Sequence, residues 1–338
     1  MIGIFNELIS LMLDLTDEQL EKVKMFILAH LKIAINPIAT YENHTCPHCG
    51  SLHIVKNGKK RDKQRFLCKD CKKTFVPTTK TAAYKSHYSA DVWTNYVGCM
   101  LSGLSVRKAG ELVGIDYKTA FYWRHKIIGS LKEILDDKLT LQGIVEADET
   151  FFPVSYKGNH SKDGFVMPRK PHKRGERAKK RGISREKVCV STMIDQNKNM
   201  QAEIAGLGRI TTEQLEKLNK IESNSILVTD KALAYIKFAD NHRFELIRLK
   251  AGKEYKRGMY HLGHINAFHS TLKRFMRGFN GVSTKHLSNY LNWHIWLVKS
   301  AEMVRKARVE DMIRQAMEHP FEMTDKQIHD KVALPLVA

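Results

Sequence analysis

Apolar residues recur at helical spacing over residues 1–34 of the chain. Thr16 and Gln19 have the spacing of a capping box, which predicts that a helix begins there and continues through LTDEQLEKVKMFILAHL. Pro37 then breaks the periodic pattern. We therefore expect an N-terminal helical segment over residues 1–40, which would pack either on a partner chain or on the protein's own core.

A second helical pattern covers residues 89–135 and contains a turn at Gly114. Gly110, before this turn, and Ala120, after it, are small enough to let two helices approach closely. This spacing is typical of a helix-turn-helix, and we place such a DNA-binding domain at residues 85–137, with a plain helical hairpin as the alternative. The candidate DNA contacts of its second helix are Lys118, Thr119, Tyr122 and Arg124.

From Gly143 onward the pattern changes to short apolar runs typical of strands. GIVEADETFF, VCVSTMID and MQAEIAGL come first, SILVTD follows a helical stretch near TTEQLEKLNKI, and FELIRL precedes the last helices. Strands in succession, followed by alternating helices and strands, indicate a mixed α/β sheet. We expect this domain to span residues 140–300, with an insertion at 156–187 and a C-terminal helical tail at 301–338.

Charge adds information that the periodicity lacks. The 338 residues include 56 Lys and Arg against 36 Asp and Glu, which gives a formal net charge of +20. An excess of this size favours a polyanionic partner such as DNA over a merely soluble basic protein. No apolar run approaches the roughly 18 residues of a membrane span, and the N-terminus lacks a basic leader, so we expect a cytoplasmic protein without a membrane partner.

The insertion between the first two strands concentrates this charge. From Arg169 to Lys187 its only acids are Glu176 and Glu186. Such a run is either a solvated, disordered loop or an arm that neutralises DNA phosphates and becomes ordered on binding. The candidate phosphate contacts in this arm are Arg169, Lys170, Lys173, Arg174, Lys179, Lys180 and Arg181.

Two CxxC motifs, CPHC and CKDC, predict a metal site in a zinc ribbon over residues 41–80. Four thiolates complete a tetrahedral zinc site and leave no open position, so the zinc should be structural, and the compartment should be reducing. Asn57-Gly58, between the two motifs, predicts the turn of a hairpin. The four predicted zinc ligands are Cys46, Cys49, Cys68 and Cys71.

Four residues of the sheet region suggest phosphodiester chemistry. Asp148 lies in the first strand, and Asp230 ends the apolar run SILVTD. Asn266 and Lys273 are seven residues apart, which is about two helical turns, so they share one helix face. Two Mg²⁺ ions in such a site prefer oxygen ligands, which Asp148, Asp230 and Asn266 offer, while Lys273 would hold a phosphate or developing charge.

Four other acids compete for these roles. Glu146 shares a strand face with Asp148 and could support it, whereas Glu149 points to the other face. Asp195 lies in DQNKN, which favours a turn over a metal site. Glu254 is the one acid that could replace Asn266 as the third ligand.

The pieces CPHC…CKDC with KKTF, VEADETFF, VTDKALAY and HINAFHSTLKRFMRGFNGVSTKHLSNYLNW resemble a known family. The chain is similar to transposases of the insertion-sequence family numbered fifteen-ninety-five, also called ISXO-like. The resemblance implies an RNase H-like catalytic domain and a DDE-type mechanism. The family includes members with Asn in place of the third acid, followed by Lys, and this pattern falls on Asp148, Asp230, Asn266 and Lys273.

The resemblance also implies a function. The ribbon and the helix-turn-helix would bind the inverted repeats at the ends of the element. The catalytic domain would nick a strand with water, and the exposed 3′-OH would attack target DNA without a covalent enzyme intermediate. Two ends must be cut in concert, which implies a homodimer or a larger synaptic oligomer. The alternatives are an inactive or domesticated DNA-binding regulator and a structure-selective nuclease on the same fold.

Overall fold

The computed structural model gives the positions of most of the chain. It describes residues 45–60, 63–136, 139–159, 182–230, 232–250, 256–318 and 323–331, together with Leu15, Thr16, Gln19, Val166, Glu254 and Phe321. The two reciprocal hydrogen bonds of the predicted capping box are present, from Thr16 N to Gln19 Oε1 at 2.9 Å and from Gln19 N to Thr16 Oγ1 at 3.3 Å. The rest of the segment at 1–40, and the insertion from 167 to 181, lie outside the described residues.

The described chain divides into two compact units. The first contains Met1–Phe121 and Val304–Glu318, and the second contains Tyr122–Met303 and His319–Ala338. Much of the predicted C-terminal tail therefore belongs with the N-terminal elements. Helix α10 (Arg305–Glu318) packs on helix α3 (Ala90–Leu101), and Arg305 Nη2 donates a hydrogen bond to Gly98 O at 3.3 Å.

A small antiparallel sheet forms the first part of unit one. Its strands are β1 (Ile54–Lys60), β2 (Lys63–Cys68) and β3 (Thr74–Phe75), in that order. The prediction of a turn at Asn57-Gly58 is wrong, because both residues lie inside β1. The β1–β2 register shifts between Lys56 and Lys59, and Gly58 has φ of 68°. The Asn-Gly pair suggested a turn because glycine readily adopts a positive φ. Here the positive φ of Gly58 instead accommodates a β-bulge.

Two helices, the second of which continues into unit two, meet at a tight corner in unit one. Helix α4 (Val106–Val113) ends at Gly114, which has φ of 73°, and α5 (Tyr117–Asp136) follows. A Cβ at Gly110 would lie 3.0 Å from Ile115 O and 3.2 Å from the Ala120 Cβ. A side chain at 110 would crowd both atoms, so the small residues that suggested a helix-turn-helix do allow this close crossing.

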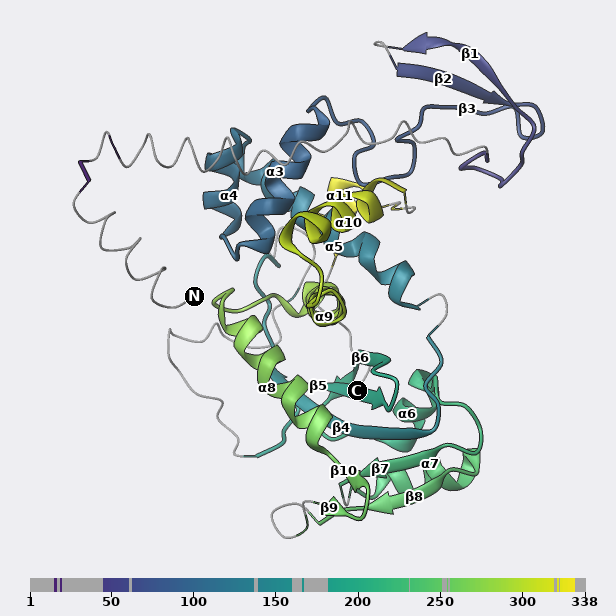
Figure 1. The fold of residues 1–338 in the computed structure, drawn as a ribbon, viewed down its shortest axis with the longest axis vertical. Helices are drawn as coiled ribbons and strands as arrows, with labels where there is room; N and C mark the ends of the chain where they lie inside the picture. The colour runs from purple at the N-terminus through teal and green to yellow at the C-terminus, as the bar shows by residue number, and fades with distance from the viewer. Residues whose placement is uncertain are drawn as a thin grey trace. The chain divides into compact units, whose positions relative to one another are not determined.

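Unit two is built on one five-stranded sheet (Figure 1). Its strands lie in the order β6-β5-β4-β7-β8, and β7 and β8 run parallel to β4 while β5 runs antiparallel to it. This mixed order is the one expected of an RNase H-like domain, so the predicted fold class is confirmed. The strands are β4 (Ile144–Pro153), β5 (Lys187–Asp195), β6 (Met200–Leu207), β7 (Ile226–Thr229) and β8 (Glu245–Arg248).

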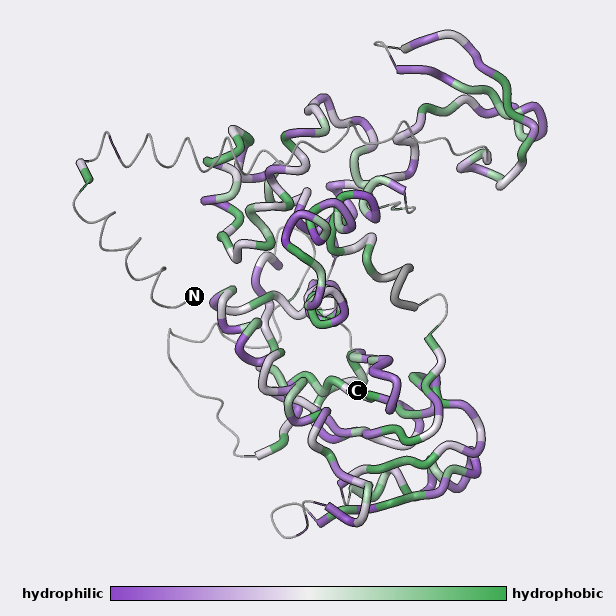
Figure 2. Tube along the Cα trace, viewed as in Figure 1, coloured by the Kyte–Doolittle hydropathy of each residue, from purple (hydrophilic) through white to green (hydrophobic). Residues whose placement is uncertain are grey.

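Both faces of this sheet are covered, which explains why its strands are apolar along much of their length (Figure 2). Val145 and Ala147 face a core with Leu215 of α6 (Thr212–Leu218) and Phe238 of α7 (Ala234–His242). The opposite face packs against α8 (Gly263–Arg277) and α9 (Leu287–Lys299). The remaining elements are β9 (Lys256–Arg257), β10 (Tyr260–His261), η2 (Thr284–His286) and α11 (Asp325–Asp330).

Candidate active site

The two aspartates of the predicted site lie at the same edge of the sheet. Strand β4 pairs in parallel with β7, and the last paired residues are Ala147 and Thr229. Asp148 and Asp230 each come one residue later in the chain. The register therefore brings the two side chains together, although they are far apart in sequence.

Burial sets the charge state of the carboxyl groups at this edge. Desolvation, reinforced by the nearby charge of Asp230, raises the pKa of Asp148 to about 6, against lowering by the Glu149 N–H and by Lys273. Desolvation also raises the pKa of Glu149 to about 7, although the Tyr235 hydroxyl donates a 2.6 Å hydrogen bond to it. Glu149 thus lies on the α7 side of the sheet, opposite to Asp148. The site concentrates negative charge that water screens poorly.

Helix α8 presents Asn266 and Lys273 beside this edge. Its buried face, which includes Ile265, Phe268 and Leu272, packs on the sheet. Asn266 and Lys273 are exposed and seven residues apart, so they project from one side of the helix, next to the buried face. Lys273 lowers the pKa of Asp148, which indicates that its ammonium lies close to that carboxylate.

A histidine between these two residues contacts Asp148. His269 Nδ1 lies 3.6 Å from Asp148 Oδ2, and His269 Nε2 lies 2.6 Å from Thr192 Oγ1. The Thr192 hydroxyl donates to the Asp148 carbonyl at 2.6 Å, so its oxygen accepts the Nε2 proton. Burial, and secondly Lys273, lowers the pKa of His269 to about 4, so the ring is neutral at pH 7.

The neutral ring of His269 has a consequence for the space beside Asp148. With Nε2 protonated, the Nδ1 lone pair faces the Asp148 carboxylate, so two acceptors point at one region. The sequence reasoning missed both His269 and Thr192. The position of His269, three residues after Asn266 and four before Lys273, was the available indication for the histidine.

Glu146 joins the same strand to the start of α8. Its Oε2 accepts a 3.1 Å hydrogen bond from Ile265 N, and its Oε1 lies 2.6 Å from His264 Nδ1. His261 Nδ1 lies 3.2 Å from the same Oε1. The carboxylate is buried at the positive end of the helix, a position that favours negative charge. Glu146 therefore fixes the helix rather than facing the carboxylate pair.

Residues 140–296 match the sequence model of the ISXO2-like transposase domain. The match contains all four residues of the predicted site. This part of the chain is an ISXO2-like transposase domain.

Three further comparisons extend beyond this domain. An uncharacterized protein in the transposable element ISH50 of Halobacterium salinarum is 25% identical over 252 residues, which cover 73% of this chain and 82% of that protein. The Mos1 strand transfer complex is similar at 15% identity and a TM-score of 0.26, over 67% of this chain and 75% of that one. A pre-cleavage Mos1 transpososome gives 12% identity and a TM-score of 0.21, over 65% and 77%. These scores are too low to carry an argument, and the fold of the transposase domain rests on its sheet order.

The competing acids of the transposase domain have other partners. Asp195 Oδ1 accepts hydrogen bonds from Asn197 N at 2.9 Å and from Asn199 N at 2.8 Å, which is the turn role that DQNKN suggested. Glu254 forms a two-point pair with Arg257, with Nε to Oε1 at 2.9 Å and Nη2 to Oε2 at 3.0 Å.

The four predicted zinc ligands come together ahead of the transposase domain. Cys46 Sγ lies 3.7 Å from Cys71 Sγ, and Cys49 Sγ lies 3.6 Å from Cys68 Sγ. The four sulfur atoms lie within 4.8 Å of one another, which is compatible with tetrahedral coordination of one metal ion. Glu146, His261 and His264 form a second group of this kind among the described residues.

The candidate DNA contacts of α5 divide into two groups. Lys118 is exposed and Thr119 is half-buried. The prediction of Arg124 as a DNA contact is corrected by the structure. Its side chain is buried, at 2% exposure, and its guanidinium lies over the Trp293 ring, 5.8 Å from the centroid. Tyr122 is half-buried, and burial raises its pKa, followed by the charges of Asp325 and Asp330. The side chains of α5 thus become more buried after the first helical turn, which the periodicity of YKTAFYWRHKI did not reveal.

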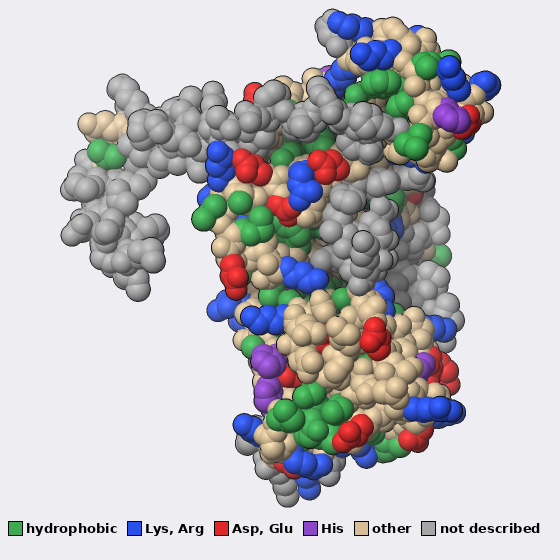
Figure 3. All heavy atoms as spheres, turned by 45° about the vertical axis from the view of Figure 1, so that its right-hand side comes forward, with side chains coloured by type: hydrophobic (Ala, Val, Ile, Leu, Met, Phe, Trp, Pro, Cys, Tyr) green, Lys and Arg blue, Asp and Glu red, His purple; other side chains and the backbone are tan. Residues whose placement is uncertain are grey.

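The surface of the small sheet is basic. Figure 3 shows more Lys and Arg than acidic side chains on this part of the molecule, at the top right of the view. Its exposed cations are Lys56, Lys59, Lys63, Lys69, Lys72 and Lys73.

Among the described residues, none of the helices has the length and apolar character needed to cross a membrane. The seven candidate contacts between Arg169 and Arg181 lie outside the described residues.

Proposed function

We propose that this protein is a DNA transposase that binds the terminal inverted repeats of an insertion sequence and catalyses strand cleavage and 3′-OH strand transfer. The observation that carries the proposal is the pairing of Asp148 with Asp230 at one sheet edge, in a setting that raises the pKa of Asp148 to about 6. A protein gains nothing in stability from two desolvated carboxylates side by side. Their placement is understandable if a cation binds between them.

The donors at this edge fit a divalent ion. Asp148, Asp230 and Asn266 would supply oxygen ligands for two Mg²⁺ ions, and oxygen is the donor that Mg²⁺ prefers. The acceptor lone pair of His269 facing Asp148 Oδ2 at 3.6 Å supports a positive charge in that space. When bound, such ions activate an attacking oxygen and stabilise the leaving oxygen.

The side chains of this chain account for the remaining requirements. In cleavage, a water oxygen bonds to phosphorus, the bond from phosphorus to the 3′ oxygen breaks, and that oxygen leaves with a proton as a 3′-OH. In transfer, the same 3′ oxygen bonds to a target phosphorus and displaces the target's own 3′ oxygen. Lys273 would hold the phosphate whose charge develops in both steps. Thr192 and His269 would fix the orientation of Asp148.

DNA binding follows from the charge of the chain and from its small modules. We assign binding of the element ends to the start of α5, at Lys118 and Thr119, and to the basic ribbon, whose four cysteines would hold a structural zinc. The insertion between Arg169 and Arg181 would neutralise phosphates of end or target DNA. Two ends cut in concert require a homodimer or larger assembly, working in the cytoplasm, where the thiols stay reduced.

The test is cleavage of a labelled element end in Mg²⁺. Asp148→Ala and Asp230→Ala should abolish cleavage and leave end binding intact, while Lys273→Ala should slow it by about 10²–10³-fold. Asn266→Ala should be severely impaired, and Asn266→Asp should keep partial activity because an oxygen ligand remains. Glu254→Ala is the matched control, because it removes a carboxylate that pairs with Arg257 instead.

Two results would overturn the assignment. If Asp148→Ala and Asp230→Ala cleave as well as the parent, the active site lies elsewhere. If the parent binds element ends but does not cleave them with any divalent ion, the DNA-binding regulator becomes the better description.

A further inference from the structure

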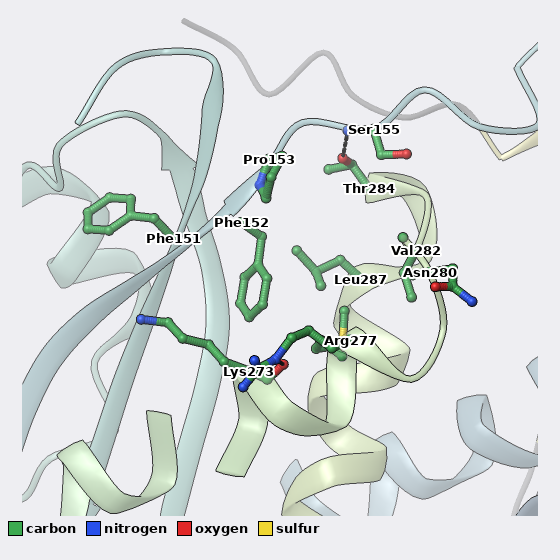
Figure 4. A pocket seen from close by; sticks show the side chains of 12 residues that line it. Phe151, Phe152, Pro153, Ser155, Lys273, Arg277, Asn280, Val282, Thr284 and Leu287 are labelled. Atoms are coloured by element: carbon green, nitrogen blue, oxygen red, sulfur yellow. Dashed lines mark hydrogen bonds between the residues drawn. The ribbon is translucent and has the colours of Figure 1, made fainter. Parts of the chain in front are cut away.

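A pocket opens beside Lys273, between β4 and the helices α8 and α9 (Figure 4). Its volume is about 640 Å³, which lies within the range of roughly 300–1,000 Å³ typical of sites for small ligands. Its lining residues are Phe151, Phe152, Pro153, Ser155, Lys273, Met276, Arg277, Asn280, Gly281, Val282, Thr284 and Leu287.

The walls of this pocket are apolar and anchored. Phe152 extends from β4 toward α8, and Leu287 lies opposite, at the start of α9 (Figure 4). Thr284 Oγ1 accepts a 2.8 Å hydrogen bond from Ser155 N, which closes one end. Lys157 Nζ donates to Asn280 O at 2.8 Å and so holds the loop that bears Val282. The cavity is therefore part of the fold and not a gap between loose side chains.

Positive charge lies at the α8 side of the pocket. Lys273 and Arg277 are four residues apart on α8, so they stand one turn apart on the same face. Among the described residues that line the pocket, none is acidic. An apolar chamber with two cations beside it suits a ligand with a flat, uncharged body and an attached phosphate. A nucleotide of a DNA strand has this composition.

The position of the pocket relative to the carboxylates indicates which part of a DNA strand could bind there. Phe152 follows Asp148 by four residues on one strand, a separation of about 13 Å at roughly 3.3 Å per residue. Lys273 belongs to both places, since it lines the pocket and lies one turn of α8 after His269, whose Nδ1 is 3.6 Å from Asp148 Oδ2. A DNA strand with one phosphate at Asp148 would therefore place a neighbouring nucleotide at the pocket.

We propose that this pocket receives one unstacked base of the DNA strand next to the phosphate that is cut, with Phe152 as the stacking surface and Lys273 and Arg277 on its flanking phosphates. The inference rests on the proposed function. Enzymes that act within a duplex commonly extrude a nucleotide into such a chamber. The pocket offers few polar side chains for base edges, and Thr284 already accepts from Ser155, so it should accept any base.

The first test reports base extrusion by fluorescence. 2-Aminopurine is placed in turn at each position flanking the cut in a duplex that carries the terminal repeat. Binding of the parent should raise the fluorescence at one position, because the probe leaves the stack of its neighbours. Val282→Trp, which fills the pocket, should remove that rise. Met259→Trp is the matched control, because Met259 is 67% exposed and does not line the pocket.

The second test uses cleavage of the same duplex. Val282→Trp should cut an intact end about tenfold to a hundredfold more slowly, the loss expected when one stacked base is displaced. An abasic nucleotide at the responding position should restore its rate. Phe152→Ala, which removes the stacking surface without filling the pocket, should show the same loss of fluorescence and gives an independent result if Val282→Trp does not fold.

The outcomes separate the two proposals. Binding without a fluorescence rise at any position overturns the pocket proposal, even if the parent cleaves normally. Cleavage by Val282→Trp at the parental rate also overturns it. Absence of cleavage by the parent overturns the proposed function alone, because the fluorescence measurement requires only binding.

Discussion

Replacing Glu146 should loosen the start of α8 and so test how the helix is held at the carboxylate edge. Glu146 is 5% exposed and accepts hydrogen bonds from Ile265 N at 3.1 Å and from His264 Nδ1 at 2.6 Å. Glu146→Ala removes both bonds. It also leaves the Ile265 N–H, which belongs to a buried residue, without its acceptor.

The size of the effect follows from these contacts. A hydrogen bond to a charged group contributes about 1.5–3 kcal/mol, and an unpaired buried donor costs about 1–3 kcal/mol. Because the contacts share one carboxylate and His264 is exposed, we expect a loss of about 3 kcal/mol rather than the full sum. In a unit of this size, 1 kcal/mol shifts the melting temperature by roughly 2–4 °C, so Glu146→Ala should melt about 6–12 °C lower.

Glu146→Gln separates stability from positioning. The amide keeps the shape and one acceptor oxygen, so this variant should remain folded at 25 °C. It lacks the negative charge at the positive end of α8, and small displacements of a catalytic group can cost about 10²-fold in rate. We therefore expect slower cleavage by Glu146→Gln, with end binding unchanged, because α8 carries Asn266 and Lys273.

The assays are thermal unfolding followed by circular dichroism and cleavage of a labelled end. Glu222→Ala is the control, because Glu222 is an exposed acid in the same unit. A melting temperature for Glu146→Ala within about 1 °C of the parent would refute the stabilising role of Glu146 at the start of α8. Parental cleavage by Glu146→Gln would show that the charge is not needed. A zinc-induced rise in the parent's melting temperature that both variants lack would instead identify Glu146, His261 and His264 as a metal site.

Two further predictions concern charge and metal. Since the folded pKa of Asp148 is raised from 3.8 to about 6, its carboxyl contributes stability below about pH 4 and loses it as the pH rises through 6. Asp148→Asn should therefore melt above the parent at pH 8 without added divalent ions but not at pH 4, and equal shifts at both pH values would contradict this reasoning. Purified, reduced protein should also carry one zinc per chain by elemental analysis, and Cys68→Ser should lose it and weaken end binding; zinc-free parent protein would exclude the structural-zinc assignment.

The parts of the fold that local sequence specifies were predictable. The spacing of four cysteines is enough to indicate their convergence, because each CxxC brings two thiols together within one short turn. Asp148 and Asp230 could be matched because Asp148 lies in one apolar run and Asp230 ends another, and parallel strands share an edge. Arg124 could not be judged in this way. Its burial depends on Trp293, which lies far along the chain, and a charged residue in an amphipathic helix gives no local indication of such a partner.

The supporting contacts of the site required the register of the sheet. Asp148 lies directly opposite Thr192 in the β4–β5 pair, and this alignment gives Thr192 access to both the Asp148 carbonyl and His269. A slip of one residue would turn every side chain of β5 to the other face, so the sequence names the strands without naming their cross-strand partners. Glu146 has the same difficulty, since its partner Ile265 is buried on a helix 119 residues later. The residues proposed to touch the ions are therefore the ones that the sequence indicated, whereas the contacts that hold them in place depend on long-range packing. For this reason the decisive variants are Glu146→Gln and the substitutions at Phe152 and Val282, whose roles rest on that packing.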